Sequence, residues 1–198
     1  YAMEGSIFIA GAGVQWLRDK LKFFNKASET EQIVKSLKDN KGIYLVPAFT
    51  GLGAPYWDAN ARGVLSGLTR DTGPKEIIRA TIESVAYQTY DLFEAMKHDG
   101  LRPKLVKVDG GMVMNNWFSQ FLSDVISIKV LRPKVQETTA LGAAFMAGLQ
   151  IGVYKSLKDI SKNWHLDKSF NPKIKAKLRE NLVKGWQKAI KRTLSTTT

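Results

Sequence analysis

The sequence predicts an α/β fold in which helices cover a layered sheet. Short apolar segments typical of strands alternate with longer segments of helical period along most of the chain. The 198 residues, of which 44% are hydrophobic and 24% charged, suffice to enclose one sizeable core. No apolar run reaches the roughly 20 residues that a membrane-spanning helix needs. We therefore expect no membrane partner and a cytoplasmic location.

The composition also excludes several kinds of catalytic and metal-binding site. The chain has no cysteine, which excludes a disulfide framework, thiol catalysis and a cysteine zinc site, and agrees with a reducing compartment. The two histidines, His98 and His165, lie far apart and have no carboxylates at ligand spacing. We therefore expect no metal site built from histidines.

The first part of the chain is expected to form a strand and two helices. Residues 1–10 have the pattern of a strand that ends in small residues, and Gly11–Gly13 leads into an amphipathic helix. The apolar positions of that helix are Val14, Leu17, Leu21 and Phe24. A second helix is predicted over 29–37, with Ser28 as its N-cap.

A turn at Asn40-Lys41-Gly42 precedes a predicted strand, "GIYLVPAF". The strand leads into a loop over 50–63 that is rich in glycine and aromatic residues, and loops of this length in a compact domain are usually functional. We interpret Tyr56 and Trp57 as packing anchors of this loop.

Two charged residues of the same loop, Asp58 and Arg62, are candidates for contact with a substrate, with a neighbouring domain or with each other. The sequence leaves these three alternatives open.

A long helix is predicted to begin at Gly73-Pro74, because proline is tolerated in a first turn. Its expected buried stripe is Ile78, Ile82, Val85, Leu92 and Met96. The strand "LVKVDGG" follows, and Asn115 or Asn116 is expected to cap the next helix, whose apolar residues are Phe118, Phe121, Leu122 and Val125. Residues 128–133 are predicted to form a strand that Pro133 ends.

Two helices are predicted in the remaining sequence. The helix over 138–154 has a face of small residues, Ala140, Gly142, Ala143 and Ala144, which we interpret as close packing on the sheet. The helix over 172–194 is basic and amphipathic, and its apolar residues recur every four positions: Ile174, Leu178, Leu182, Trp186, Ile190 and Leu194.

The net charge of +12 raises the question of a nucleic-acid partner. More than half of it comes from the last segment, where only Glu180 opposes Lys173, Lys175, Lys177, Arg179, Lys184, Lys188, Lys191 and Arg192. We interpret this segment as a solvated helix face, with an electrostatic contact to a partner or an acidic surface as the alternative. We therefore expect no nucleic-acid partner.

Two glycine-rich turns are the candidate ligand site. Gly110-Gly111 stands between a strand and a helix that Asn115 opens, and Gly11 with Gln15 stands in the same relation to the first helix. Glycine lets a ligand approach the main chain, and a helix N-terminus offers free N–H groups. Two such turns indicate one ligand, such as a nucleotide, held from two sides. The structural alternative is a tight turn with glycine at positive φ and asparagine as a cap.

Asp109 is the acidic residue beside the second turn. Its carboxylate could orient a magnesium-bound water or cap a local amide, and the sequence does not decide between these roles.

The segment "GVLSGLTRDTGPKEIIRATIES" over 63–84 resembles the second signature of the FGGY family of carbohydrate kinases. The matching positions are Gly63, Leu65, Gly67, Leu68, Glu76, Ile77, Ala80, Thr81, Ile82 and Glu83. The loop "PAFTGLGAPYWDANARG" resembles the members of that family that act on glycerol, as do "YAMEGSIFIAGAGVQWLRD" and "VDGGMVMNNWF". The resemblance covers most of the chain and weakens toward its C-terminal end.

The resemblance implies a fold, a cofactor and site residues. The expected fold is an actin-like, ribonuclease H-like ATPase domain, with 1–198 forming most of the C-terminal domain of a two-domain kinase without its first strands. ATP or ADP with Mg²⁺ is the implied cofactor. By this resemblance Gly11 and Gln15 contact the phosphate side of the nucleotide, while Gly111 and Asn115 hold the adenosine.

The resemblance also implies the activity of a longer parent polypeptide, the ATP-dependent phosphorylation of glycerol to sn-glycerol 3-phosphate. Its catalytic aspartate and one phosphate-binding loop are expected upstream, so no catalytic residue is assigned in this chain, which alone should be inactive. The implied partners are glycerol, the N-terminal kinase domain of the same polypeptide, and further copies in a homo-oligomer. The alternatives are another sugar or polyol kinase of the family and a non-catalytic actin-like nucleotide-binding module.

Overall fold

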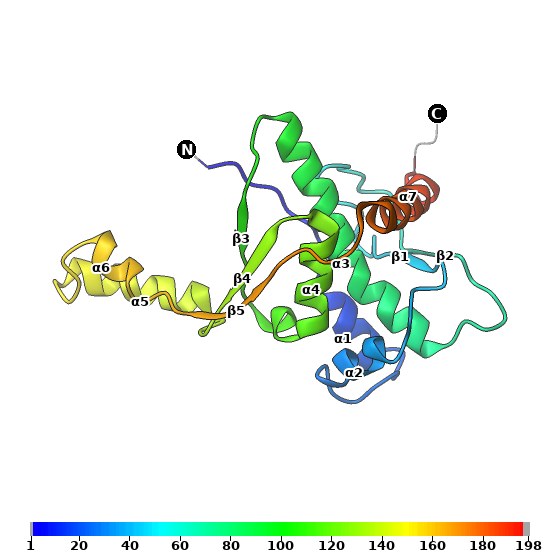
Figure 1. Ribbon diagram of the computed structural model, residues 1–198, viewed down its shortest axis with the longest axis horizontal. Helices are drawn as coiled ribbons and strands as arrows, with labels where there is room; N and C mark the ends of the chain where they lie inside the picture. The colour runs from blue at the N-terminus through cyan, green and yellow to red at the C-terminus, as the bar shows by residue number, and fades with distance from the viewer. Residues whose placement is uncertain (1, 196–198) are drawn as a thin grey trace.

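Helix α3 (Pro74–His98) runs through the middle of the molecule, and most other elements pack around it (Figure 1). We describe the protein from a computed structural model of residues 2–195. Tyr1, which opens the first predicted strand, and the threonines that end the chain lie outside the described residues.

The start of α3 follows the prediction. Gly73 is extended, Pro74 is the first helical residue, and the Glu76 carboxylate accepts a hydrogen bond from the Gly73 amide at 3.0 Å. This bond satisfies one of the free donors at the helix N-terminus. In the predicted stripe, Ile78, Ile82 and Val85 are buried, and Leu92 and Met96 are partly buried.

The strands form two small sheets. Strand β3 (Leu105–Lys107) pairs in parallel with β4 (Lys129–Pro133), and β4 pairs antiparallel with β5 (Leu166–Phe170). Strand β1 (Tyr44–Val46) pairs antiparallel with β2 (Val64–Ser66). The predicted α/β class is confirmed. Strands β2 and β5 were not predicted, and four of the five residues of β5 are exposed, so its sequence lacks the alternation of a half-buried strand.

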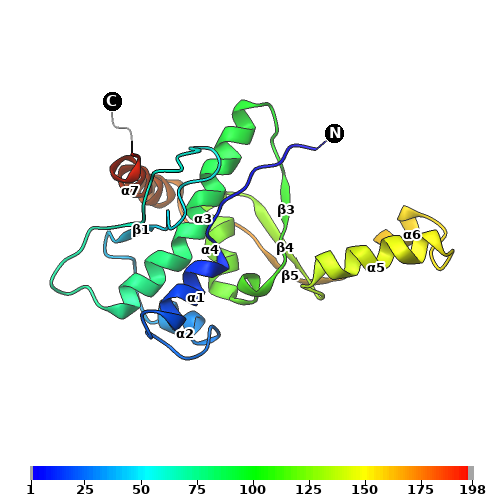
Figure 2. The ribbon, with the colours of Figure 1, turned by 180° about the vertical axis from the view of Figure 1, so that it is seen from behind.

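Two helices and a turn shape one end of α3. Helices α1 (Gly11–Asp19) and α2 (Glu29–Lys35) pack there, and α4 (Asn116–Ile126) lies along α3 (Figures 1 and 2). A 3₁₀ helix, η1 (Gly111–Met114), was not predicted and connects the turn after β3 to α4. Asn115 caps α4, as one of the two predicted alternatives required.

Two details of the first helices differ from the prediction. Helix α1 ends at Asp19, so Leu21 and Phe24 lie outside the helix, and Lys22 beyond its end adopts a left-handed conformation with φ of 57°. Ser28 makes no side-chain cap for α2, and the Glu29 carboxylate instead accepts a hydrogen bond from the Lys26 amide at 2.7 Å.

The predicted strand over residues 1–10 is wrong for the described residues 2–10. The Ser6 carbonyl accepts a hydrogen bond from the Ala54 amide at 2.9 Å, and the Ile9 carbonyl accepts one from Gln88 Nε2 at 3.2 Å. A strand needs a neighbouring strand to pair its backbone groups. This segment pairs with a loop and a helix side chain, so it is extended without belonging to a sheet.

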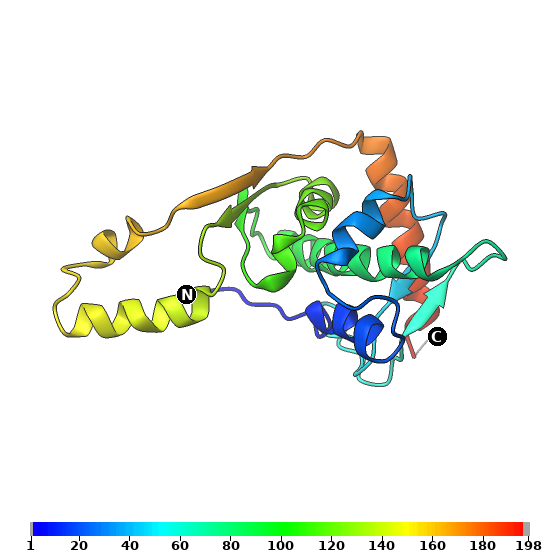
Figure 3. The same ribbon diagram turned by 90° about the horizontal axis from the view of Figure 1, so that it is seen from below.

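The predicted packing of the small residues in 138–154 is also wrong. Helix α5 (Thr138–Gln150), with α6 (Leu157–Ser161), extends away from the rest of the molecule (Figures 1 and 3). Within α5 only Gly148 is buried, and a Cβ at Gly142 would meet no atom within 4 Å. The small residues therefore do not serve close packing in this structure.

Helix α7 (Ala176–Thr193) is the last helix of the described residues and packs beside β1 (Figure 1). Trp186 and Ile190 are buried as predicted, while Leu178 is 50% exposed. A repeat of four residues drifts by about 40° at each step around a helix of 3.6 residues per turn, so it leaves the buried face. Val183 and Ala189 complete that face instead.

The largest fully buried side chains define the core. They come from α1, α2, β1, α3, α4, β4 and α7 and include Trp186, Tyr87, Leu17, Ile78, Ile82, Val34, Val46, Val125 and Val130. The core therefore joins elements from the beginning of the chain, such as α1, to α7 near its end.

Candidate functional site

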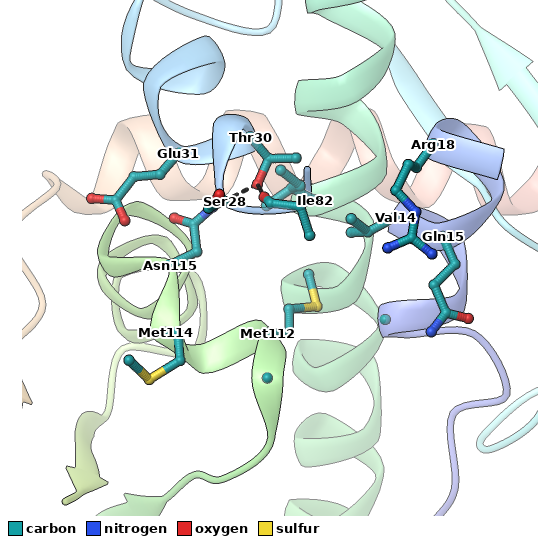
Figure 4. A pocket seen from close by; sticks show the side chains of 13 residues that line it. Val14, Gln15, Arg18, Ser28, Thr30, Glu31, Ile82, Met112, Met114 and Asn115 are labelled. Atoms are coloured by element: carbon teal, nitrogen blue, oxygen red, sulfur yellow. Dashed lines mark hydrogen bonds between the residues drawn. The ribbon is translucent and has the colours of Figure 1, made fainter. Parts of the chain in front are cut away.

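A cavity of about 490 Å³ lies between α1, the start of α2, α3 and the turn that holds η1 (Figure 4). It is lined by all four residues predicted to bind the nucleotide: Gly11, Gln15, Gly111 and Asn115. The two glycine turns are about one hundred residues apart in the sequence, and the fold brings them to one place.

The two glycines at the start of α1 have different physical roles. A Cβ at Gly13 would lie 3.0 Å from Thr81 Cγ2, so glycine there lets α1 pack closely on α3. A Cβ at Gly11 would meet no protein atom within 4 Å, and Gly11 lines the cavity. Close packing therefore explains Gly13, while the bare backbone at Gly11 is available to a ligand.

The second turn combines both interpretations that the sequence left open. Gly110 has φ of 81°, a conformation that side chains rarely adopt, so a structural requirement for glycine exists there. Gly111 has no atom within 4 Å of an added Cβ and faces the cavity. The first glycine makes the turn, and the second leaves the main chain open.

Asn115 is held by hydrogen bonds at both ends of its amide. Its Oδ1 accepts from the Phe118 amide at 2.9 Å, and its Nδ2 donates to Thr30 Oγ1 at 3.3 Å. The first bond is the N-cap of α4. The second, which is long, fixes the direction of the amide edge at the cavity wall (Figure 4).

Two charged side chains line the cavity, one on each side. Glu31 in α2 accepts from the Asn116 amide at 3.0 Å and from Lys35, and although burial raises its pKa, these hydrogen bonds lower it below the ordinary value. Arg18 in α1 forms an ion pair with Asp19 at 2.7 Å, which raises the pKa of Arg18. The remaining walls are mainly apolar, from Val14, Ile82, Met112 and Met114.

Asp109 does not line this cavity, and it accepts a hydrogen bond from the Thr138 hydroxyl at the start of α5. Within residues 2–195 no group of three or more His, Cys, Asp or Glu side chains is placed to hold a metal ion. The magnesium role of Asp109 stays a prediction.

The charged residues of the aromatic loop do not pair with each other. Asp58 accepts hydrogen bonds from the Ser195 amide at 2.7 Å and from the Asn60 amide at 3.0 Å. Arg62 donates to the carbonyls of Ala59 and Ala61. Both side chains thus hold the loop itself, and Asp58 ties it to the end of the chain.

The two aromatic residues of the loop differ. The Tyr56 hydroxyl donates to the buried Asp91 carboxylate at 2.8 Å, which makes Tyr56 the anchor that was predicted. The same prediction is wrong for Trp57, which is 68% exposed and contacts the Phe8 ring edge-on.

Several lining residues were missed by the sequence analysis. Val14 and Arg18 follow Gly11 at helical spacing, so the period of α1 would have placed them on the same face. Ser28, Thr30 and Glu31 reach the cavity only because α2 packs beside Asn115, and no local pattern signals that contact.

No helix within the described part of the chain is long and apolar enough to cross a membrane.

The fold places the chain in a class of proteins. Its arrangement of helices and strands matches solved sugar kinases, and it is the actin-like ATPase fold of such kinases. A family model described as the C-terminal domain of the FGGY family of carbohydrate kinases matches residues 1–151. The chain belongs to the FGGY family of carbohydrate kinases, within its C-terminal domain.

Individual relatives agree with this assignment. The chain is 56% identical over 195 residues to glycerol kinase 1 of Pseudomonas aeruginosa, covering 98% of this chain and 40% of that protein. It is 54% identical over 193 residues to glycerol kinase of Symbiobacterium thermophilum, covering 97% of this chain and 39% of that protein. The chain thus spans about 40% of the length of the curated relatives that it matches.

Solved structures give the same picture. The structure of Plasmodium falciparum glycerol kinase with ADP matches with a TM-score of 0.86 and 38% identity, covering 96% of this chain and 38% of that one. A xylulose kinase from Lactobacillus acidophilus matches with a TM-score of 0.79 at 24% identity, covering 98% of this chain and 40% of that one. The second match shows the fold alone.

Proposed function

We propose that the chain is the nucleotide-binding half of an ATP-dependent glycerol kinase, whose full polypeptide converts glycerol and ATP to sn-glycerol 3-phosphate and ADP. The observation that carries the proposal is the meeting of Gly11, Gln15, Gly111 and Asn115 in one cavity. The similarity to glycerol kinases over 98% of the chain supports glycerol as the substrate. The relative solved with ADP supports an adenine nucleotide as the ligand.

The residues of the cavity fit a nucleotide. Added Cβ atoms at Gly11 and Gly111 would meet no protein atom within 4 Å, so these glycines leave room for a ligand rather than for packing. In the proposed arrangement Gly11 opens α1 and presents free amides to the phosphates, with Gln15 one turn further along. Gly111 and Asn115 then border the adenosine.

The role of this chain in the reaction is to bind and orient the nucleotide. Phosphoryl transfer depends on positioning and on stabilisation of charge around the transferred group, for which magnesium bound to the phosphates supplies positive charge. We assign no catalytic residue to the chain. The base for the glycerol hydroxyl and a second phosphate-binding loop belong, in this proposal, to the N-terminal kinase domain, and closure of the two domains excludes water.

The proposal extends to the organisation of the protein. Helix α7 lies beyond the 151 residues that match the family model, yet Val183, Trp186 and Ile190 pack in the same core as α3. We therefore treat 1–198 as one domain, part of a cytoplasmic enzyme that forms a homo-oligomer.

Titration of the chain with ADP tests the nucleotide site. Gly111→Val should fold, because a Cβ at this position meets no atom, yet its side chain would occupy the space of the ligand. We expect at least a tenfold loss of ADP affinity by calorimetry. Gly142→Val in α5 is the matched control, since it is equally open and lies outside the cavity. Unchanged affinity in Gly111→Val would place the adenosine elsewhere.

The substrate is tested with the full-length parent by measuring ATP consumption with glycerol, xylulose, ribulose and gluconate in parallel. Turnover with glycerol alone is the expected result. Turnover with another polyol would keep the family and refute the substrate, and no turnover with any of them would favour a non-catalytic nucleotide-binding module.

A further inference from the structure

We propose that Arg18 forms one wall of the base-binding part of the cavity, with the flat face of its guanidinium packed on the purine ring. The inference rests on the proposed nucleotide function and deepens it, because it names a residue that holds the base rather than the phosphates.

The position of Arg18 along α1 separates it from the phosphate end. Gly11 is the first residue of α1, and Arg18 follows seven residues later on the cavity side. Seven residues of α-helix span about 10 Å along the axis and about two turns. The Arg18 side chain reaches back over part of this length, so a nucleotide whose phosphates meet the free amides at Gly11 and that extends along α1 brings its nucleoside part beside the guanidinium (Figure 4).

The ion pair with Asp19 prepares Arg18 for a flat contact. Arg18 Nε donates to Asp19 Oδ1 at 2.7 Å, and Arg18 Nη2 donates to Oδ2 at 3.0 Å. Two parallel bonds fix the plane of the guanidinium, and the carboxylate offsets its charge. The carboxylate occupies the Nε–Nη2 edge of the guanidinium, so the flat face stays free to stack on an aromatic ring.

The other walls suit a flat ring. Figure 4 shows the Arg18 side chain reaching back along α1 toward Gln15, on the opposite side of the cavity from η1. There Gly111 offers bare main chain, and Met112 and Met114 offer thioethers, which contact aromatic rings favourably. Thr30 and Asn115 add polar groups at the end of the cavity where the edge of a base would lie.

The test is a calorimetric comparison of two ligands, ADP and inorganic pyrophosphate, on the 198-residue chain. Arg18→Lys keeps the positive charge and removes the flat face, so we expect ADP to bind about threefold to thirtyfold more weakly. Pyrophosphate has no base, and its affinity should change less than twofold. Arg102→Lys, at an exposed arginine outside the cavity, is the matched control and should change neither.

A second variant, Arg18→Met, removes both the positive charge and the flat guanidinium and makes the comparison decisive. Under the proposal Arg18→Lys and Arg18→Met lose similar ADP affinity, even if pyrophosphate binds too weakly to measure. Two results would overturn the base contact without refuting the nucleotide site. Either Arg18→Lys binds ADP as tightly as the unaltered chain does, or it loses equal affinity for ADP and for pyrophosphate. Failure of the unaltered chain to bind ADP would overturn the proposed function and this inference together. Circular dichroism of each variant establishes that it is folded.

Discussion

Asp91 joins three elements through one buried carboxylate. It lies in α3 and accepts hydrogen bonds from the Tyr56 hydroxyl at 2.8 Å and from Trp186 Nε1 at 2.6 Å. Burial raises the pKa of Asp91 to about 6, although both hydrogen bonds favour the ionised form. The carboxylate thus connects the aromatic loop to α7 at the cost of holding a charge in the interior.

The raised pKa of Asp91 predicts a pH-dependent stability. An acid whose folded pKa exceeds its unfolded value binds more protons when folded, so its contribution to stability falls as the pH rises from about 4 to about 6. Asp91→Asn keeps an acceptor oxygen for Tyr56 and Trp186 and cannot ionise. We expect this variant to gain stability relative to the unaltered chain between pH 4 and pH 7, by up to about 3 kcal/mol.

Urea unfolding at pH 4.5 and pH 7.5 measures this effect in both proteins. A difference between Asp91→Asn and the unaltered chain that is the same at both pH values would show that Asp91 does not carry the predicted proton.

Glu83 is a second buried carboxylate of α3, and it has three hydrogen-bond partners where Asp91 has two. It is buried in α3 and accepts from Arg79 Nε at 2.7 Å, from Asn40 Nδ2 at 3.0 Å and from the Tyr87 hydroxyl at 3.1 Å. Burial raises the pKa of Glu83, and these partners oppose the rise. Ile82, the neighbour of Glu83 in α3, lines the cavity, whereas none of the residues of this network does.

At the scale of elements, the contact between α7 and β1 depends on a missing side chain. A Cβ at Gly185 would lie 2.2 Å from the Tyr44 hydroxyl oxygen and 2.4 Å from its Cζ. Tyr44 is buried, and its ring packs on the Tyr87 ring with the two ring centroids 5.7 Å apart. It therefore has little freedom to move away. Glycine in the middle of a helix costs about 1 kcal/mol relative to alanine, and here it permits close packing.

We therefore expect Gly185→Ala to destabilise the protein despite the better helix propensity of alanine. Overpacking costs about 1–3 kcal/mol, which outweighs the propensity gain of at most about 1 kcal/mol. The free energy of unfolding in urea should fall by about 1–2 kcal/mol. Gln187→Ala, at an exposed position of the same helix, is the control and should change it by less than about 0.5 kcal/mol. A more stable Gly185→Ala would show that α7 shifts freely on β1.

At the scale of the whole molecule, α7 belongs to the core although it lies beyond the residues that match the family model. Trp186 is fully buried and stacks on Tyr87 with ring centroids 5.4 Å apart. Its indole N–H also satisfies Asp91. One side chain of α7 therefore supports both the central helix and the aromatic loop.

Trp186→Ala should consequently cost about 3–5 kcal/mol of unfolding free energy. Global stabilities are only about 5–15 kcal/mol, so the variant should melt at a much lower temperature or fail to fold. Leu178→Ala in the same helix removes a side chain that is 50% exposed and should change stability little. Thermal unfolding followed by circular dichroism compares the two, and equal melting temperatures would refute a structural role for α7 in the core.

Helix α5 shows the reverse relation between sequence and burial. Its residues are apolar or small nearly all round, a composition typical of a buried helix. In the structure it projects from the body (Figure 3), and Met146 within it and Ile151 at its C-cap are 51% and 77% exposed. Composition alone predicts that a helix can be buried, but only its neighbours decide whether it is.

The sequence by itself determined the elements whose signals are local. The proline at the start of α3, the asparagine that caps α4 and the proline that ends β4 each act within a few residues, so they could be placed from the pattern. The motif around 63–84 identified the family because many positions match at fixed spacing. Both glycine turns were recognised as ligand candidates for the same local reason.

Only the tertiary structure decided which of these features meet. Packing of α2 beside Asn115 brought Thr30 and Glu31 to the cavity, and the fold placed Gly11 opposite Gly111. It also left residues 2–10 without a strand partner and α5 without cover, although both have the sequence of packed elements. The physical reason is common to all of these cases: burial and pairing are properties of two surfaces, and the sequence of one segment describes only one of them.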